Sequence, residues 1–529
     1  MSYSLISESW LPVVRRDSGA GFIRPAQIVE RIETDPVIAI NWPRADFRLA
    51  TLEFLIGLLA VACPPETSRE WRRSYITPPD VETLEAAFAP FANVFNLDGD
   101  GPRFMQDFEP LAAAPNEAAT LLIEAPGEQS IKKNADLLNK RGQVQKLSRA
   151  AAAMALYTLQ TYAPAGGAGN RTGLRGGGPL TTLVLPSENP TLWQVVWANT
   201  PYGKPVLQAD WPRVFPWLTR TITSENDRKI SPENEENDRL VFWGAPRRVR
   251  LMFEKNKDST TCDLTGQTDE VMVTGWVQRP NGANYTSEAF VHPLTPRYKP
   301  KPKEAISFPV HAQPSGIGYK DFVGLLFKTA DGTDIPAQCI DTYVKTRHPA
   351  IKGDWRLLAA GYDMDNMMAR GFVEAELPVF MGDDVEAQAQ AVTQLIDGAD
   401  NIVGILRSSV RNALFSAGAK PDAGATLFAT LRARFWAKSE VDFYKALRSL
   451  AKGENRDDVA LSFLAALRVL ALKMFDEAAP ITDSDRPDRV ASAARLLGLA
   501  LRGYGKMGAS LFGAFNLAPP ETSQKRKKA

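Results

Sequence analysis

Residues 166–179 read GGAGNRTGLRGGGP, a stretch in which seven of fourteen residues are glycine. Glycine permits positive φ and places no side chain between the main chain and a partner. The two arginines within it, Arg171 and Arg175, favour an anionic partner. The preceding residues 147–160 are alanine-rich and predict a helix, and residues 180–185 (LTTLVL) predict a strand. The chain therefore runs from helix through this glycine loop to strand.

This order excludes nucleotide-cofactor loops. A dinucleotide fingerprint needs a strand before its glycines and a helix after them, and the third glycine here, Gly173, comes one position late. No G-x-x-x-x-G-K-[ST] occurs anywhere in the chain. Two interpretations remain. The loop is either a tight connection whose glycines satisfy turn geometry, or a backbone surface that faces a nucleic-acid groove or phosphate chain.

The segments around the loop predict a large mixed part at the N-terminal side. Residues 10–14 predict an opening strand, residues 46–63 a buried helix and residues 80–96 a further helix. Residues 124–141 are polar and include Lys132 and Lys133, which predicts a surface loop able to order on an anionic partner. Residues 180–380 mix short strands with turns, and we expect strands at 240–243, 248–253 and 270–277.

The composition changes near residue 384. From Val385 apolar residues recur every seven positions, and further helical segments are predicted at about 424–450, 456–478 and 487–506. Four amphipathic helices with short loops indicate a four-helix bundle. The sequence thus predicts an α+β fold, with a mixed α/β domain over 1–380 that has irregular β-rich portions, a bundle over 384–516 and a basic disordered tail over 517–529.

Charge is distributed unevenly. The net charge is +1, yet residues 486–529 hold nine Lys or Arg against two acidic residues, which indicates a local electrostatic footprint. In the bundle's last helix we expect phosphate contacts from Arg489, Arg495, Arg502 and Lys506. The proline-spaced segment 297–303 (RYKPKPK) is either a solvated linker or an extended strip that follows a nucleic-acid backbone. Arg44 is either a structural arginine or a phosphate contact.

Several function classes find no support. The three cysteines are far apart without C-x-x-C, and the longest apolar run is too short for a membrane span, so we expect a cytoplasmic protein with free thiols and no membrane partner. The three histidines form no H-x-x-x-H or H-E-x-x-H pair. We therefore expect no enzyme activity, no catalytic residue, no metal and no cofactor.

Several motifs occur in one order along the chain. They are W-x-P-V at Trp10, P-R-x-D at Pro43, F-M-Q at Phe104, TGLRGGGPLTT at 172–182, A-G-Y at Ala360 and R-F-W-x-x-S-E at Arg434. In this order they resemble the large subunit, CasA type, of the type I-E CRISPR Cascade surveillance complex, over nearly the whole chain. The resemblance implies a non-catalytic subunit that recognises the protospacer-adjacent motif from the minor-groove side, promotes duplex opening for R-loop formation and recruits the helicase-nuclease.

The resemblance also implies site residues and partners. The motif would be read by the glycine loop, by a lysine on a neighbouring extended segment and by the tip of a β-hairpin, which here are Gly166, Gly167, Ala168 and Gly169, Lys301 or Lys303, and Asp365, Asn366 and Met367. Nucleic-acid backbone contacts would come from eight basic residues, which are Arg171, Arg175, Lys132, Lys133, Arg489, Arg495, Arg502 and Lys506. The implied partners are the backbone, small and crRNA 5′-end subunits of Cascade, crRNA, double-stranded target DNA and its displaced strand.

Two departures from the family pattern affect these expectations. Asn366 stands where the family's hairpin commonly has glutamine as a wedge, and it has methionines nearby at 364 and 367. Some relatives hold zinc with two C-x-x-C pairs, which this chain lacks, so we expect no zinc. An alternative function is a structural scaffold subunit of an RNA-protein assembly that does not read DNA.

Overall fold

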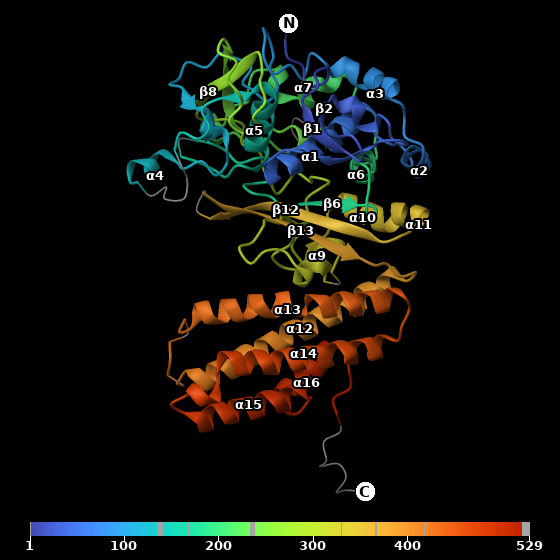
Figure 1. Ribbon diagram of the computed structural model, residues 1–529, viewed down its shortest axis with the longest axis vertical. Coiled ribbons are helices and arrows are strands. Elements are labelled where there is room, and N and C mark those ends of the chain that lie inside the picture. Colours follow the sequence, from blue (N-terminus) through green and yellow to red (C-terminus); the bar gives the residue numbers. More distant parts are fainter. Residues whose placement is uncertain are drawn as a thin grey trace. The chain divides into compact units, whose positions relative to one another are not determined.

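The computed structural model describes residues 2–134, 141–167, 169–232, 238–329, 331–365, 368–416, 418–420 and 422–520. The chain divides into two units, which we call the mixed unit (1–316 and 324–376) and the helical unit (317–323 and 377–529). Figure 1 shows sheets and helices in the mixed unit and long helices, coloured orange to red, in the helical unit. The predicted α+β fold with C-terminal helices is confirmed. The return of residues 317–323 to the helical unit was not predicted.

The core of the mixed unit is built around α1 (Ala45–Ala62), which is mostly apolar and almost entirely buried, with Asp46 and Glu53 as buried carboxylates. The ring of Phe54 packs edge-on against five aromatic rings, among them Trp10 at 5.4 Å and Trp243 at 5.6 Å between centroids. The other α-helices described before residue 352 are α2 (Ser68–Ile76), α3 (Val81–Phe88), α4 (Glu128–Lys132), α5 (Arg149–Tyr162), α6 (Leu192–Asn199), α7 (Trp211–Val214), α9 (Phe322–Leu326, which begins in the helical unit), α10 (Gln338–Thr342) and α11 (His348–Ile351).

Small sheets surround this core. Their strand orders are β2-β1-β3, β4-β8-β5 with β7 paired to β8, β13-β12-β6, and β10-β9-β11. The strands are β1 (Leu11–Arg15), β2 (Gly19–Ile23), β3 (Val37–Ile40), β4 (Asn116–Glu117), β5 (Leu147–Ser148), β6 (Thr181–Leu185), β7 (Arg248–Lys255), β8 (Val271–Arg279), β9 (Arg297–Tyr298), β10 (Phe308–Pro309), β11 (Asp334–Ile335), β12 (Trp355–Asp365) and β13 (Met368–Val379).

Most predicted elements of the mixed unit are confirmed, and two need correction. The opening strand, the helix at 46–63 and the strands at 248–253 and 270–277 correspond to β1, α1, β7 and β8. Residues 240–242 belong to a 3-10 helix and not to a strand, and Trp243 lies in the turn that follows. All four side chains are buried, and those of Phe242 and Trp243 lie against Gly57 of α1. The helix predicted at 80–96 ends at Phe88 because Pro90 follows, and a short 3-10 turn continues the chain.

The helical unit contains α12 (Val385–Leu414), α13 (Ala425–Ala451), α14 (Arg456–Ala478), α15 (Pro487–Leu501) and α16 (Gly505–Ala514). The seven-residue seam of α12 is buried from Val392 through Leu406 to Ala413, as predicted. The last predicted helix is wrong at its end. The chain turns at Gly503, whose φ is +94°, and α16 packs back against α15. The described chain stops at 520, so the predicted tail lies largely outside the described residues.

Residues 317–323 contribute an aromatic anchor to the helical unit. The Tyr319 ring stacks on Phe443 at 4.4 Å between centroids and meets the edge of Trp436 at 5.0 Å. Its hydroxyl is 2.7 Å from Ser439 Oγ, which is fully buried. This explains the R-F-W-x-x-S-E motif of α13, since Trp436 and Ser439 hold a segment that comes from earlier in the chain.

Candidate nucleic-acid interface

The glycine loop joins α5, which ends at Tyr162, to β6, which begins at Thr181, so the predicted order of helix, loop and strand is confirmed. Its first part is a tight turn in which the Gly166 N–H donates to Asn170 O at 3.1 Å. Gly167 is exposed, and a Cβ added to it would have no atom within 4 Å. Ala168 lies outside the described residues. The main chain at Gly167 is therefore open to a partner.

The base of this turn is held by two neighbouring segments. Gly169 has φ +72°, and an added Cβ would lie 2.7 Å from Asn281 Oδ1. Arg171 Nε donates to Ser224 Oγ at 3.1 Å, and the Ser224 N–H donates to Asn281 O at 3.2 Å. Arg171 is half-buried, and its hydrogen bond to Ser224 helps to hold the loop in place.

The second part of the loop, Gly173 to Pro179, packs against its surroundings. Gly173 touches the Thr161 carbonyl, and an added Cβ on Gly177 would lie 2.8 Å from Pro164 Cα. Gly178 has φ +64°, and its added Cβ would lie 2.5 Å from Tyr362 O on β12. These glycines therefore serve close packing, whereas Gly167 does not.

This contrast leads to a stability prediction. Gly178→Ala is expected to lower the free energy of unfolding by about 1–3 kcal/mol. The alanine would have to adopt a left-handed backbone conformation, and its Cβ would clash with the Tyr362 carbonyl oxygen. Urea unfolding followed by tryptophan fluorescence measures the change. Gly167→Ala, with open space around it, is the matched control. Equal stability of the two variants would contradict the packing role of Gly178.

The second part of the loop also brings distant segments together. The Leu180 N–H donates to Val310 O at 2.8 Å, and Pro179 forms an isolated β-bridge with His311. Ala312 in turn bridges to Asp363 on β12. Thus the glycine loop, the segment after β10 and the β12 strand of the β12–β13 pair adjoin, although they lie far apart in the sequence.

His311 stands at this junction and was not singled out from the sequence. Its Nδ1 is 2.8 Å from Gly177 O, and burial lowers the pKa of its imidazole. The ring also lies 3.0 Å from an added Cβ on Gly176. Nothing in the sequence pattern marks this role, because the contact depends on tertiary packing.

Arg175 requires a correction. We expected it to contact a nucleic-acid backbone, but only 2% of its side chain is exposed. Its Nη2 donates to Glu53 Oε2 at 2.7 Å, and its Nη1 donates to Thr295 Oγ1 at 3.0 Å and Thr181 Oγ1 at 3.1 Å. Burial alone lowers the pKa of Arg175, but the Glu53 carboxylate outweighs it and the pKa is raised. Arg175 therefore fixes the glycine loop to α1 from within the core.

The segment 297–303 is neither a simple linker nor an extended strip. Tyr298 pairs with Phe308, so β9 and β10 form a hairpin whose connection is residues 299–307, and we call this unit the basic hairpin. Arg297 is buried and donates to Phe290 O and Glu288 O. Lys301 is 78% exposed with Glu304 3.8 Å away, and Lys303 is also exposed. The two lysines named from the sequence thus lie on the surface.

The end of β12 carries a small charge cluster. Arg370 on β13 donates to Asp363 Oδ1 at 2.7 Å and to Asp365 Oδ2 at 3.3 Å. Asp365 is exposed, whereas Asp363 is buried. Asn366 and Met367, the predicted wedge, lie outside the described residues. Arg370 offsets two carboxylates that would otherwise repel phosphate groups near this end of the strand pair.

The remaining basic candidates in the mixed unit differ in their surroundings. Lys132 and Lys133 are exposed at the end of α4. Arg44 is a structural arginine and not a phosphate contact. Its Nη2 lies 2.8 Å from Asp46 Oδ2 and 2.7 Å from Glu124 Oε2. Burial on its own lowers the pKa of the Arg44 guanidinium. The hydrogen bonds to Glu124 and Asp46 have the larger opposite effect, so the pKa lies above its ordinary value. Tyr362 on β12 donates to the same Asp46 carboxylate at 2.6 Å.

In the helical unit Arg489 also requires a correction. Its Nε donates to Asn412 O at 2.5 Å and its Nη2 to Phe415 O, so it binds carbonyls at the end of α12. Arg495, Arg502 and Lys506 are exposed. Because the chain turns at Gly503, Lys506 belongs to α16 rather than to the helix that carries Arg495.

The sequence as a whole matches one family model, described as CRISPR-associated protein Cse1, over residues 4–474. This chain belongs to the Cse1 family. The resemblance inferred from its ordered motifs is thereby confirmed. Among solved structures, CasA of Thermus thermophilus has a TM-score of 0.69 at 15% identity, with 95% of this chain and 99% of that chain covered.

Other solved chains share the Cse1 fold. Cse1 of Acidimicrobium ferrooxidans has a TM-score of 0.65 at 17% identity, covering 98% of this chain and 99% of that chain. A chain in a structure titled CRISPR RNA-guided surveillance complex has a TM-score of 0.66 at 17% identity, covering 94% and 99%. At these identities the likeness concerns the fold of the Cse1 chain and not its individual site residues.

Three further observations concern this Cse1 chain as far as the structure describes it. Among the described residues, no group of three or more His, Cys, Asp or Glu side chains is arranged to hold a metal ion. Within those residues, no helix combines the length and apolar character needed to cross a bilayer. The three cysteines are free thiols, with Cys262 and Cys339 buried.

Proposed function

We propose that this chain is a non-catalytic subunit of a crRNA-guided defence complex that reads a protospacer-adjacent motif from the minor-groove side. The observation that carries the proposal is the meeting of the glycine loop, the segment after the basic hairpin and β12 in one place. In the first part of the same loop Gly167 offers bare main chain, and the turn is supported at Gly169 by Asn281 and at Arg171 by Ser224, which are hydrogen-bonded to each other. Membership of the Cse1 family and the surveillance-complex relative support the same function.

The physical basis is the shape of the minor groove. A groove about 6 Å wide admits bare backbone and thin side chains, so the turn at Gly166, Gly167, Ala168 and Gly169 is suited to approach its floor. Lys301 or Lys303 would supply a cation to the adjacent phosphates. A side chain among Asp365, Asn366 and Met367 would wedge the base pairs apart, which costs a few kcal/mol that contacts to the bent duplex offset.

The proposed partners follow from this role. The chain would bind the backbone, small and crRNA 5′-end subunits of Cascade, with Lys132 and Lys133 near crRNA. It would also bind the displaced strand through the helical unit and recruit the helicase-nuclease after duplex opening. The exposed lysines beside a polar loop, Arg495 on α15 and Arg502 directly after it are suited to contacts with phosphate groups.

The deciding experiment measures target binding by the reconstituted complex across a randomised motif library. Motif-dependent enrichment that disappears when this chain is omitted or carries Gly167→Asp is the expected result. Enrichment that does not depend on the identity of residue 167 would contradict the proposed reader. Uniform binding across the library would instead favour a scaffold subunit that does not read DNA.

The helical unit yields a quantitative prediction. Replacing Arg495, Arg502 and Lys506 together by glutamine is expected to flatten the logarithmic salt dependence of target binding by about 2, since each neutralised phosphate of a single strand contributes about 0.7. Titrations of the complex at several salt concentrations measure the slope. Arg489→Gln is the matched comparison, and it should alter stability more than the slope because it binds the end of α12. An unchanged slope in the triple variant would refute the contact.

A further inference from the structure

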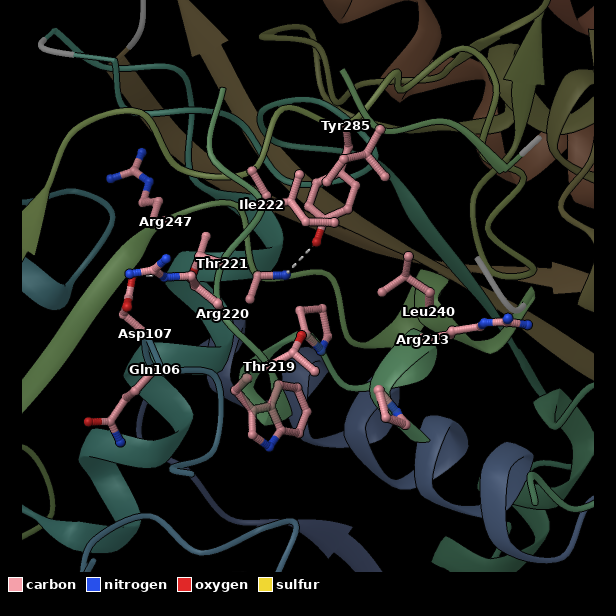
Figure 2. A pocket seen from close by; sticks show the side chains of 16 residues that line it. Gln106, Asp107, Arg213, Thr219, Arg220, Thr221, Ile222, Leu240, Arg247 and Tyr285 are labelled. Atoms are coloured by element: carbon pink, nitrogen blue, oxygen red, sulfur yellow. Dashed lines mark hydrogen bonds between the residues drawn. The ribbon is translucent and has the colours of Figure 1, made fainter. Parts of the chain in front are cut away.

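A cavity of about 230 Å³ lies in the mixed unit between the segment 212–222, residues 240–247 and residues 283–285. Its apolar walls include Trp217, Ile222, Leu240 and Tyr285. We call it the Trp217 cavity (Figure 2). Pockets for drug-sized ligands usually span about 300–1,000 Å³, so this cavity is suited to a smaller group such as one flat ring system.

Three of the four charged side chains that line the cavity are cationic. Arg213, Arg220 and Arg247 line it, together with Asp107. The Asp107 carboxylate already accepts from Arg248 Nε at 2.6 Å and Thr221 Oγ1 at 3.1 Å. Figure 2 shows Arg220 beside Asp107 and Tyr285 and Leu240 across the cavity. Arg220 also donates to Glu109 Oε1 at 3.0 Å, so of these three arginines Arg247 is the one whose charge no described carboxylate offsets. The lining therefore combines an apolar floor with one buried, uncompensated cation and two exposed arginines at its edge.

Arg247 has an unmet donor. Its Nη2 donates to Pro164 O at 2.6 Å, but its Nε is buried and has no hydrogen-bond partner among the described residues. Burial lowers the pKa of Arg247 to about 10, because no carboxylate compensates its charge. A buried donor without a partner is costly, and an anionic acceptor would relieve that cost.

We propose that the Trp217 cavity is a binding site for a single nucleotide. Its base would lie between the apolar walls, and its phosphate would face the arginines. An inorganic anion would leave the apolar walls unfilled, and an apolar ligand would leave the buried Arg247 Nε without an acceptor. A DNA strand, an RNA strand and a free nucleotide share this chemistry, so each is a source from which the bound nucleotide could come. The choice of target DNA among these rests on the proposed function.

The position of the cavity connects it to the glycine loop. The wall at Thr221 and Ile222 continues to Ser224, which accepts the hydrogen bond from Arg171. The wall at 283–285 follows Asn281, which supports Gly169, and Arg247 binds the Pro164 carbonyl just before the loop. A nucleotide in this cavity would therefore lie beside the supports of the loop, where a base displaced from an opened duplex can be captured.

The test uses the full chain and ligand-observed NMR with dAMP, AMP, adenosine and inorganic phosphate. Saturation transfer to the base protons of dAMP or AMP is expected. Ile222→Trp fills the cavity and should abolish the transfer. Arg220→Gln should weaken mononucleotide binding roughly three- to tenfold through loss of a charge-assisted contact. Arg220 is 80% exposed, so this variant keeps the fold, and Arg69→Gln, an exposed arginine outside the lining, is the matched control.

The outcomes separate this site from motif reading. Transfer that persists in Ile222→Trp, or no transfer to either mononucleotide, overturns the site. Equal affinity for adenosine and AMP overturns the role of the arginines. Retained mononucleotide binding in Gly167→Asp supports a site that is independent of the reader, whatever the motif assay shows. A preference for dAMP or for AMP shows whether the site favours DNA or RNA. The fluorescence of 2-aminopurine, placed in one strand of the assembled complex at a time, then identifies the strand that supplies the nucleotide.

Discussion

Replacing Arg175 by methionine is expected to lower the free energy of unfolding of the mixed unit by about 3–5 kcal/mol, because it leaves the Glu53 carboxylate buried without its partner. Glu53 is completely buried, and Arg175 is its cationic contact. The ion pair also ties the glycine loop to α1. Urea unfolding followed by tryptophan fluorescence measures the loss, and the midpoint should fall without a large change in slope.

Two comparisons show whether the loss comes from an unpaired buried charge. The double variant Arg175→Met with Glu53→Gln should recover a large part of the stability, since no bare carboxylate remains in the core. Arg434→Met removes one of two cationic partners of Glu477 on the surface of the helical unit, the other being Lys438, and should cost less than about 1 kcal/mol. A double variant no more stable than Arg175→Met alone would argue against this explanation.

Gly167→Asp is expected to weaken binding of closed, motif-bearing duplex by the assembled complex at least about tenfold, because a carboxylate at the groove floor repels phosphates and blocks close approach. The open space around Gly167 lets the chain accommodate the side chain without loss of stability. Gel-shift titrations with the same target in closed and pre-opened form measure the effect.

The pre-opened bubble is the critical substrate. Since it needs no motif-dependent opening, Gly167→Asp should change its affinity less than about twofold. Gly167→Ala, which adds only a methyl group, should fall between the wild-type chain and Gly167→Asp on closed duplex. Equal losses of affinity on closed and open substrates would show that residue 167 contributes general DNA affinity and not motif reading.

Local pattern predicted the fold where one period or composition dominated. The seam of α12, the apolar helix α1 and the alternation in β7 and β8 each signal their structure within one segment. Residues 240–243 were misassigned because four consecutive apolar or aromatic residues fit either a strand or a buried turn. The turn at Gly503 was missed because a single glycine within a periodic segment does not reveal a change of chain direction.

The candidate site depends on partners that are distant in sequence, which limits what pattern can predict. The glycine content of the loop indicated close approach, but not that Gly178 meets β12 whereas Gly167 meets open space. Arg171 and Arg175 lie in the same glycine-rich sequence context. Of the two, Arg175 forms an ion pair with a buried carboxylate, Glu53, which lies more than a hundred residues earlier in the chain. His311 and the Trp217 cavity have no sequence signature, since each is assembled from several segments.

The membership of residues 317–323 in the helical unit has a consequence for how the protein can be divided. The chain passes from one unit to the other after residues 316, 323 and 376, so no single cut separates them. A fragment that begins at Leu377 would contain all five long C-terminal helices but lack Tyr319, leaving the rings of Trp436 and Phe443 exposed to water. Autonomous production of the helical unit therefore requires a circular permutation or a linker that restores this segment, and evolutionary exchange of the unit between proteins would have to carry it along.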